Sequence, residues 1–375
     1  MKILIVTEGY FPGEKYGGPP VSVDNFCTLM TECKCFVITK DHDKDEKNKY
    51  SNIKMGEWND RGNCNVKYMS DTEYNKKNFE NAIIDIKPDI IYLQSLFQGC
   101  IVSCLQLALK YKIKVILAPR GELCSGAFKK KYKKIPYIIL LKKFGLLKNV
   151  YYQSTSDEET EAIIRILRVE LKKIKQLSNI PSIPLEEYVH KKKKSNSGRF
   201  IFLSRIHPKK NLLTAIKCLK TVKGECILDV YGPLEDKLYW EECMRNIEIL
   251  PENVKVRYMG MINHTEVHKK FSEYDAFLFP TFSENYGHVI AEALFSGTVV
   301  ITSDQTPWID LEINNVGWAI GLDEERKITK AVQTIIDMDN NEYSLMSENA
   351  KKYVYKKTNL ESLKKEYQEL LEIEV

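Results

Sequence analysis

The stretch from residue 280 to residue 294 has the sequence P-T-F-S-E-N-Y-G-H-V-I-A-E-A-L and follows the apolar run A-F-L-F at 276–279. The run is short and ends at a proline, which predicts a buried strand. A polar turn follows, and the apolar spacing from His288 onward predicts a helix. Strand, turn and helix in this order form the repeating unit of a parallel sheet covered by helices.

The same alternation extends in both directions from this stretch. Short apolar runs that predict buried strands are separated by longer amphipathic stretches that predict helices. These runs are K-I-L-I-V-T at 2–7, K-C-F-V-I-T at 34–39, D-I-I-Y-L at 89–93, K-V-I-L-A at 114–118, R-F-I-F-L at 199–203, C-I-L-D-V-Y at 226–231, V-K-V-R-Y-M at 254–259 and T-V-V-I-T at 298–302. We therefore predict an α/β protein with two Rossmann-like, doubly wound parallel sheets.

The alternation is interrupted between residues 180 and 198. Two prolines, a run of lysines and the segment S-N-S-G form a polar connector there, and 375 residues are too many for one ordinary core. We predict an N-terminal domain over 1–182, a C-terminal domain over 198–355 and a final helical segment over 356–375.

The bulk composition excludes several classes of protein. The net charge of +5 is small for 375 residues, so nucleic acid is not an expected partner. The ten cysteines lack zinc-site spacing, and we expect reduced, buried thiols. We find no signal peptide and no apolar run of membrane-spanning length, and therefore expect a cytoplasmic protein.

The turn after residue 280 is the first candidate site. Ligands of open parallel sheets bind beyond the carboxyl ends of the strands, so we expect the site in a cleft between two sheets that face each other. The backbone N–H groups at 285–289 would lie at a helix N-terminus, which favours anions. Glu284 and Glu292 would flank this end of the helix. The alternative is an ordinary turn with two solvated glutamates.

Two further loops follow predicted strands. In L-S-R-I-H-P-K-K-N-L at 203–212, Arg205 and Lys210 could hold a diphosphate, or they could be surface residues before a helix. The loop at 9–21 contains Gly17 and Gly18 but lacks G-x-G-x-x-G spacing, which argues against a nicotinamide dehydrogenase. The six histidines form no metal-hydrolase motif, and we expect no metal.

Basic and apolar residues interleave in F-K-K-K-Y-K-K-I-P-Y-I-I-L-L-K-K-F-G-L-L-K at 128–148. This pattern is typical of a helix on an anionic membrane surface. It is equally typical of helices that pack their apolar side on a sheet, and both interpretations can hold. Peripheral association with the inner membrane is therefore one expected partnership.

Together, S-E-N-Y-G-H-V-I-A-E-A-L and S-R-I-H-P-K-K-N resemble the E-x7-E and Arg/Lys motifs of the family 4 retaining glycosyltransferases, which have the GT-B fold. Further segments resemble the members that build bacterial cell-surface polysaccharides; these are P-R-G-E-L-C-S-G-A at 119–127, S-T-S-D-E-E at 154–159, residues 256–260 and T-P-W at 306–308. The resemblance covers nearly the whole chain and is strongest in the second half.

The resemblance implies a retaining, metal-independent transferase that uses a UDP- or GDP-linked sugar as co-substrate, with no cofactor. Its acceptor would be a glycan or a lipid-linked oligosaccharide for O-antigen, capsule or exopolysaccharide. Glu284 would contact the donor sugar, Glu292 the ribose, and Arg205 and Lys210 the diphosphate. The final helix would return to the first domain. The remaining donor-binding residues would be Gly17, Gly18, Gly260, Met261, Asn285, Tyr286, Gly287 and His288.

One departure from the family concerns the N-terminal domain. Many relatives carry a histidine after the strand that corresponds to 89–93, where this chain has Gln94 and Ser95. We therefore expect a front-face substitution in which the leaving phosphate assists deprotonation of the acceptor. The alternatives are a sugar-nucleotide epimerase or hydrolase, and a non-catalytic scaffold of a polysaccharide assembly complex.

Overall fold

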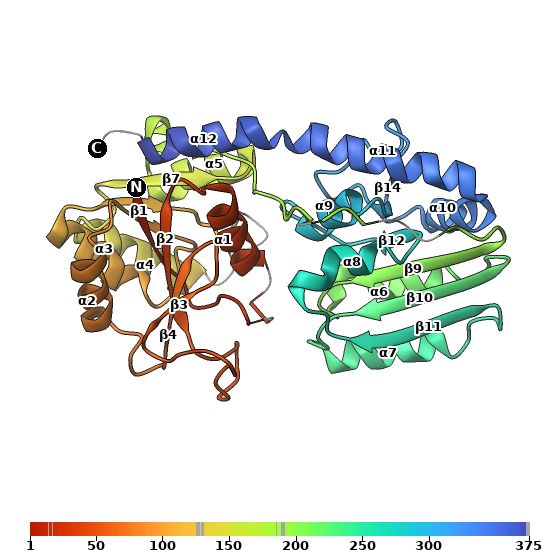
Figure 1. Ribbon diagram of the computed structural model, residues 1–375, viewed down its shortest axis with the longest axis horizontal. Coiled ribbons are helices and arrows are strands. Elements are labelled where there is room, and N and C mark those ends of the chain that lie inside the picture. The colour runs from red at the N-terminus through yellow and green to blue at the C-terminus, as the bar shows by residue number, and fades with distance from the viewer. Residues whose placement is uncertain are drawn as a thin grey trace. The chain divides into compact units, whose positions relative to one another are not determined.

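The computed structural model describes residues 1–13, 15–16, 18–124, 128, 131–184, 186–188 and 192–372. The chain divides into two compact units, one formed by residues 1–180 with 360–375 and the other by residues 181–359. Each unit contains one predominantly parallel sheet with helices packed on it (Figure 1). The predicted fold class, two Rossmann-like parallel-sheet domains, is confirmed.

The first unit contains an eight-stranded sheet in the order β3-β4-β2-β1-β5-β6-β7-β8, in which only the β3–β4 pair is antiparallel. Its elements are β1 Lys2–Val6, α1 Gly18–Leu29, β2 Lys34–Lys40, β3 Trp58–Asp60, β4 Asn65–Met69, α2 Lys76–Ile86, β5 Ile90–Leu93, α3 Ile101–Tyr111, β6 Lys114–Leu117, α4 Lys131–Lys143, β7 Val150–Ser154, α5 Asp157–Leu167, the 3₁₀ helix η1 Leu171–Lys173, β8 Ile174–Gln176 and, from the end of the chain, α12 Leu360–Glu372.

The two faces of this sheet form separate hydrophobic cores because successive strand residues point to opposite faces. Ile3 and Ile5 of β1 pack with residues of α1 and α12. Leu4 and Val6 pack with residues of α2, α3, α4 and α5. Helix α12 thus covers one face of the first sheet, although it lies at the opposite end of the sequence.

The second unit contains a six-stranded, wholly parallel sheet in the order β11-β10-β9-β12-β13-β14. Its elements are β9 Ser197–Leu203, η2 Pro208–Lys210, α6 Leu212–Lys217, β10 Glu225–Tyr231, α7 Lys237–Ile247, β11 Val254–Gly260, η3 His264–Glu266, α8 Val267–Phe271, β12 Ala276–Phe279, α9 His288–Phe295, β13 Val299–Ser303, β14 Gly317–Ile320, α10 Glu325–Asp337 and α11 Asn340–Thr358.

The strand order of the second sheet reverses once. From β9 the chain builds outward through β10 and β11, then returns to the other side of β9 and builds outward through β12, β13 and β14. The loops that follow β9 and β12 therefore leave neighbouring strands in opposite directions. Such a topological switch point is where doubly wound sheets form their binding crevices.

The sequence predicts a helix that starts near Ser22. Helix α1 instead begins at Gly18, because Pro19 and Pro20 occupy its first turn, where a proline is tolerated. The short strands β3, β4, β8 and β14 were not predicted. The segment S-D-E-E at 156–159 predicts a helix N-terminus, and helix α5 begins there, with the side chain of Ser156 accepting a hydrogen bond from the N–H of Glu159.

All ten cysteines are free thiols, and eight of them are buried. Among the described residues, no helix combines the length and apolar character needed to cross a bilayer.

The contact of α12 with the first sheet gives a stability prediction. The buried hydroxyl of Tyr367 accepts a hydrogen bond from Nε2 of Gln153 (2.8 Å) and donates to the carbonyl of Ser178 (3.1 Å). We expect Tyr367→Phe to lower the free energy of unfolding of the first unit by about 1–3 kcal/mol, because both partners lose a buried bond. Tyr355→Phe, at a half-exposed position on α11, is the matched control in urea denaturation. Equal midpoints for the two variants would contradict the role of this hydroxyl.

Candidate functional site

The loops after β9 and β12 are held together by backbone and side-chain hydrogen bonds. The side chain of Asn211 donates to the carbonyl of Pro280 (2.8 Å), and the N–H of Phe282 donates to the carbonyl of Lys209 (3.0 Å). Asn211 is left-handed, with φ 59°, a conformation that asparagine tolerates better than most residues. These bonds fix Lys210, which precedes Asn211, against the turn that carries Glu284.

Lys210 and Glu284 form an ion pair at this junction. Their side chains are only 14% and 15% exposed, so each charge depends on the other for compensation. The hydroxyl of Thr281 also lies 3.4 Å from Oε1 of Glu284. The structure therefore brings together two of the residues that the sequence analysis singled out, from loops 74 residues apart.

Arg205 follows β9 directly and pairs with a residue that the sequence analysis missed. Its Nη1 lies 2.9 and 2.8 Å from the two carboxylate oxygens of Glu235, in the loop after β10. Both side chains are more than one third exposed. A guanidinium has five N–H donors, so this contact orients Arg205 and leaves its Nε and Nη2 available for a ligand.

In the same loop after β10, Gly232 lies very close to the backbone that follows β9. Gly232 has φ 130°, and a Cβ atom at that position would lie 1.9 Å from the carbonyl oxygen of Ser204. Only glycine fits such a close approach. The signal in the sequence was the Gly-Pro pair at 232–233, which directly follows the predicted strand at 226–231.

Helix α9 begins at the end of the turn. Gly287, the N-cap residue, has φ 77°, and its carbonyl accepts the N–H of Ile290 (2.9 Å). The N–H groups before Ile290 therefore have no acceptor within the helix, as at any helix N-terminus. The indole N–H of Trp308 donates to the carbonyl of Tyr286 (2.7 Å) and fixes the turn from the side of β13.

Glu292 lies one turn into α9 and is 5% exposed. Within the part of the chain that the structure describes, its carboxylate has no hydrogen bond and no ion pair. The charge of this carboxylate affects the pKa values of two nearby side chains, Tyr286 and His268. Burial raises the pKa of Tyr286, and the carboxylate of Glu292 raises it further. Burial lowers the pKa of His268, and the same carboxylate opposes that shift.

The remaining predicted residues are placed as follows. Gly260 ends β11 with φ 80°, and its carbonyl accepts the N–H of Gly232 (2.8 Å), while Met261 beside it is half-exposed. These residues lie at the same carboxyl edge as Arg205. In the first unit, Gly18 is the exposed first residue of α1. Gly17 lies outside the described residues.

The geometry suits an anionic ligand that also carries hydroxyl groups. Arg205 and Lys210 supply cationic donors, the N-terminus of α9 supplies a favourable dipole, and Glu284 and Glu292 supply acceptors. All of these groups follow strands near the switch point between β9 and β12.

Comparison with protein-family models finds a match within the second unit. Residues 186–353 match the model described as "Glycosyl transferases group 1". Among curated proteins, the chain is 29% identical over 244 residues to a Klebsiella pneumoniae protein described as an "uncharacterized 41.2 kDa protein in cps region". That match covers 58% of this chain and 61% of the length of the relative.

Several solved structures share the whole fold of this chain. Anabaena Alr3699/HepE in complex with UDP-glucose matches with a TM-score of 0.70 at 14% identity, over 99% of both chains. WaaG, a glycosyltransferase involved in lipopolysaccharide biosynthesis, matches with a TM-score of 0.64 at 13% identity, over 99% of this chain and 100% of its own. Sucrose-phosphate synthase from Thermosynechococcus elongatus matches with a TM-score of 0.67 at 13% identity, over 99% and 98%. The chain therefore has the GT-B fold, and residues 186–353 of its second unit are similar to the group 1 glycosyl transferases.

Proposed function

We propose that this protein is a retaining glycosyltransferase that moves a sugar from a nucleoside diphosphate sugar to a glycan acceptor. The observation that carries the proposal is the carboxylate of Glu292, a residue only 5% exposed, which forms no hydrogen bond or ion pair among the described residues and lies one turn behind the N-terminus of α9. A carboxylate with so little access to water is favoured by a partner that donates hydrogen bonds. A ligand whose hydroxyl groups donate to Glu292 would be such a partner, and a ribose is such a ligand.

The diphosphate of the donor would bind between Arg205 and Lys210. Each cation already holds one carboxylate, Glu235 or Glu284, and these pairs fix the positions of the two head groups. The ammonium of Lys210 has two further N–H donors, and the guanidinium of Arg205 keeps a second edge free for a bidentate contact with phosphate. The diphosphate would then need no divalent metal to neutralise it.

Glu284 would accept hydrogen bonds from the hydroxyl groups of the transferred sugar. Its backbone N–H donates to the carbonyl of Gln305 (3.2 Å), and its carboxylate is held by Lys210. The turn at 285–288 would lie along the sugar and the diphosphate, with Gly287 allowing a close backbone approach. Gly260 and Met261, at the neighbouring strand end, would border the base.

The chemical step would occur on one face of the donor sugar. The bond between the anomeric carbon and the β-phosphate oxygen breaks, and the acceptor oxygen forms its bond to that carbon on the same face, so the anomeric configuration is retained. The acceptor hydroxyl gives its proton to the leaving phosphate oxygen. Arg205, Lys210 and the α9 N-terminus stabilise the negative charge that develops on the diphosphate.

The nature of the substrates is supported by the relatives. Anabaena HepE was solved with UDP-glucose, which favours a UDP-linked donor. The Klebsiella relative in a cps region and WaaG in lipopolysaccharide biosynthesis favour a lipid-linked oligosaccharide acceptor and a role in polysaccharide assembly. Such an acceptor would be met at the cytoplasmic face of the membrane.

Donor binding is tested by thermal shift with UDP, GDP, CDP, ADP and their common sugar conjugates. A ligand at a hundred times its Kd stabilises the native state by about 2.7 kcal/mol. We expect a selective shift with UDP compounds that is lost in Glu292→Ala and Arg205→Ala. The matched control is Glu273→Ala, whose carboxylate pairs with Lys270 on α8 and should leave the shift unchanged. A lack of any shift would favour the non-catalytic scaffold.

Transfer is tested with radiolabelled donor and a membrane extract as acceptor source. We expect Lys210→Ala and Glu284→Ala each to lower kcat by about 10²–10³, the loss typical of removing one group that stabilises a developing charge. The Lys270→Ala enzyme should keep its rate. Near-normal rates in both site variants would contradict the assigned roles, and release or epimerisation of the sugar without acceptor would identify the epimerase or hydrolase instead.

A further inference from the structure

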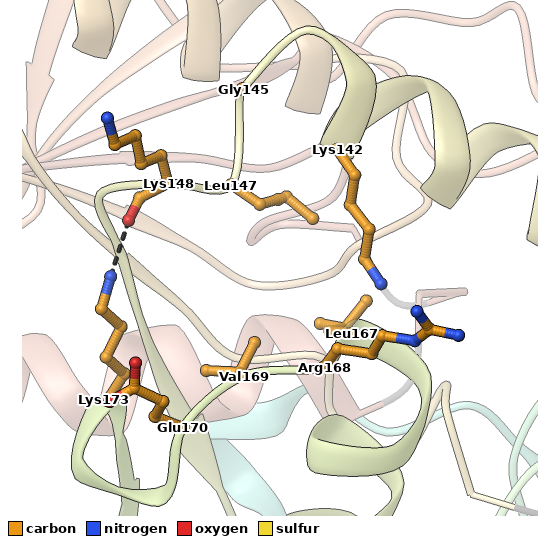
Figure 2. A pocket seen from close by; sticks show the side chains of 9 residues that line it. All are labelled: Lys142, Gly145, Leu147, Lys148, Leu167, Arg168, Val169, Glu170 and Lys173. Carbon is orange, nitrogen blue, oxygen red and sulfur yellow. Dashed lines mark hydrogen bonds between the residues drawn. The ribbon is translucent and has the colours of Figure 1, made fainter.

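The first unit contains a hollow of about 420 Å³, lined by residues at the end of α4 and after α5 (Figure 2). Two of its lysines donate to backbone carbonyls, Lys142 to Ile166 (3.1 Å) and Lys173 to Lys148 (2.6 Å). Among the described residues that line the hollow, no polar side chain is deeply buried without a hydrogen-bond partner. The hollow therefore gives no chemical indication of a ligand.

The carboxyl edge of the first sheet does give such an indication. Gln94 directly follows β5 and is only 1% exposed. Within the described part of the chain, its Nε2 atom is buried and has no hydrogen-bond acceptor. Burying an amide nitrogen without a partner is costly. A group of this kind in a native structure therefore calls for a physical explanation.

The orientation of the Gln94 amide is fixed by Arg120, which lies in the loop after β6. The Nε and Nη2 atoms of Arg120 both donate to Oε1 of Gln94, at 2.9 and 2.7 Å. A guanidinium carries donors and no acceptor, so the amide cannot be turned around to place its nitrogen against Arg120. The unpartnered group is therefore the NH₂ of Gln94 and not its oxygen.

Arg120 is itself held in place by neutral side chains. Its Nη1 atom donates to the side chain of Asn179, and its Nη2 atom donates to the hydroxyl of Tyr92 (3.3 Å). Its backbone is left-handed, with φ 54°, a conformation that persists in such a residue only where the surroundings enforce it. The contacts of Arg120 thus hold the Gln94 amide in one orientation.

Gln94 lies where the strand order of the first sheet reverses. The strands up to β4 lie on one side of β1, and β5 pairs on the other side. The loops after β1 and β5 are joined, because the N–H of Glu8 donates to Gln98 (3.1 Å) and the N–H of Gly99 donates to Glu8 (2.8 Å). Doubly wound sheets bind their ligands beyond the strand ends at such a switch point.

The carboxylates near this edge already have donors. Glu122 accepts from the hydroxyl of Ser95 and from the N–H of Leu96, both at 2.7 Å. Glu159 accepts from the N–H groups of Gly121 (2.6 Å) and Thr155 (2.8 Å). The group that would complete the hydrogen bonding of Gln94 is therefore an acceptor oxygen supplied by a ligand.

We propose that Gln94 donates a hydrogen bond from Nε2 to an oxygen of the glycan acceptor, and that Arg120 is the positioning residue that orients the amide. This inference rests on the proposed function, in which the donor contacts come from the second unit. A hydroxyl or ring oxygen of a sugar suits a neutral amide donor. Because an amide does not titrate at physiological pH, Gln94 orients the acceptor and takes no proton from it.

The contact is tested with Gln94→Glu in the transfer assay with radiolabelled donor. This change keeps the size of the side chain and an oxygen toward Arg120, but it replaces the NH₂ group by an oxygen. We expect kcat/KM for the acceptor, measured over a series of extract dilutions, to fall by about tenfold to a hundredfold, as is typical when one buried hydrogen bond is lost. The thermal shift with UDP should be unchanged.

Gln153→Glu is the matched control. Gln153 is also a buried glutamine of the first sheet, in β7, but both ends of its amide have partners. Its Oε1 accepts from Tyr92, and its Nε2 donates to Tyr367 (2.8 Å). We expect this variant to be less stable in urea denaturation, while the folded protein transfers sugar with the natural kcat/KM.

Two further variants keep the test independent of one substitution. Gln94→Met removes the donor without adding charge and should lower kcat/KM as Gln94→Glu does. Arg120→Lys keeps the charge but loses the two-point contact with Gln94, so we expect a higher KM for the acceptor and a kcat near the natural value. A purely structural role of Arg120 would lower stability and leave KM unchanged.

Three results would overturn the inference. Natural kcat/KM in both Gln94 variants would remove the contact and leave the proposed function standing. A loss of the UDP shift equal to the loss of transfer would assign Gln94 to the general integrity of the fold. An absence of transfer by the natural protein with every donor would overturn the proposed function and this inference together.

Discussion

The reversal of strand order between β9 and β12 is the constraint on which the second unit depends. It sends two loops away from neighbouring parallel strands in opposite directions, and this opens a place for a ligand at the carboxyl edge. Two loops that diverge must still be held in register with each other. The bonds from Asn211 to Pro280 and from Phe282 to Lys209 do this, and they fix Lys210 beside Glu284.

Charge compensation then sets what this edge can bind. Lys210 with Glu284 and Arg205 with Glu235 are pairs formed before any ligand arrives, so the charges are preorganised at little cost in side-chain entropy. Glu292 differs from them, because it is more deeply buried and has no partner among the described residues. The site as a whole thus offers oriented donors for an anion at one point and an acceptor without a partner among the described residues at another, which suits the proposed nucleoside diphosphate.

The site residues that follow apolar strands were predicted from the sequence. The residues whose roles depend on tertiary contacts were missed. β1, β2 and β9 to β13 were predicted because runs such as R-F-I-F-L leave no helical alternative. β4 and β14 were not predicted, although the equally short β12 and the similarly alternating β11 were. Glu235 and Gly232 were missed because their roles come from contact with Arg205 and Ser204 across neighbouring strands. The burial of Glu292 likewise depends on packing around α9, which helix spacing does not reveal.

Helix α4 shows why periodicity alone left two interpretations open. Its apolar residues occur on both sides of the helix, so its sequence has no polar face that would indicate which side meets the sheet. The sheet covers Ile138 and Leu141, and the residues on the other side remain apolar and exposed. A surface helix that only covered the sheet would gain nothing from exposed apolar side chains on its other side. Polar side chains at those positions would be more favourable in free energy, because they would leave less apolar surface in contact with water.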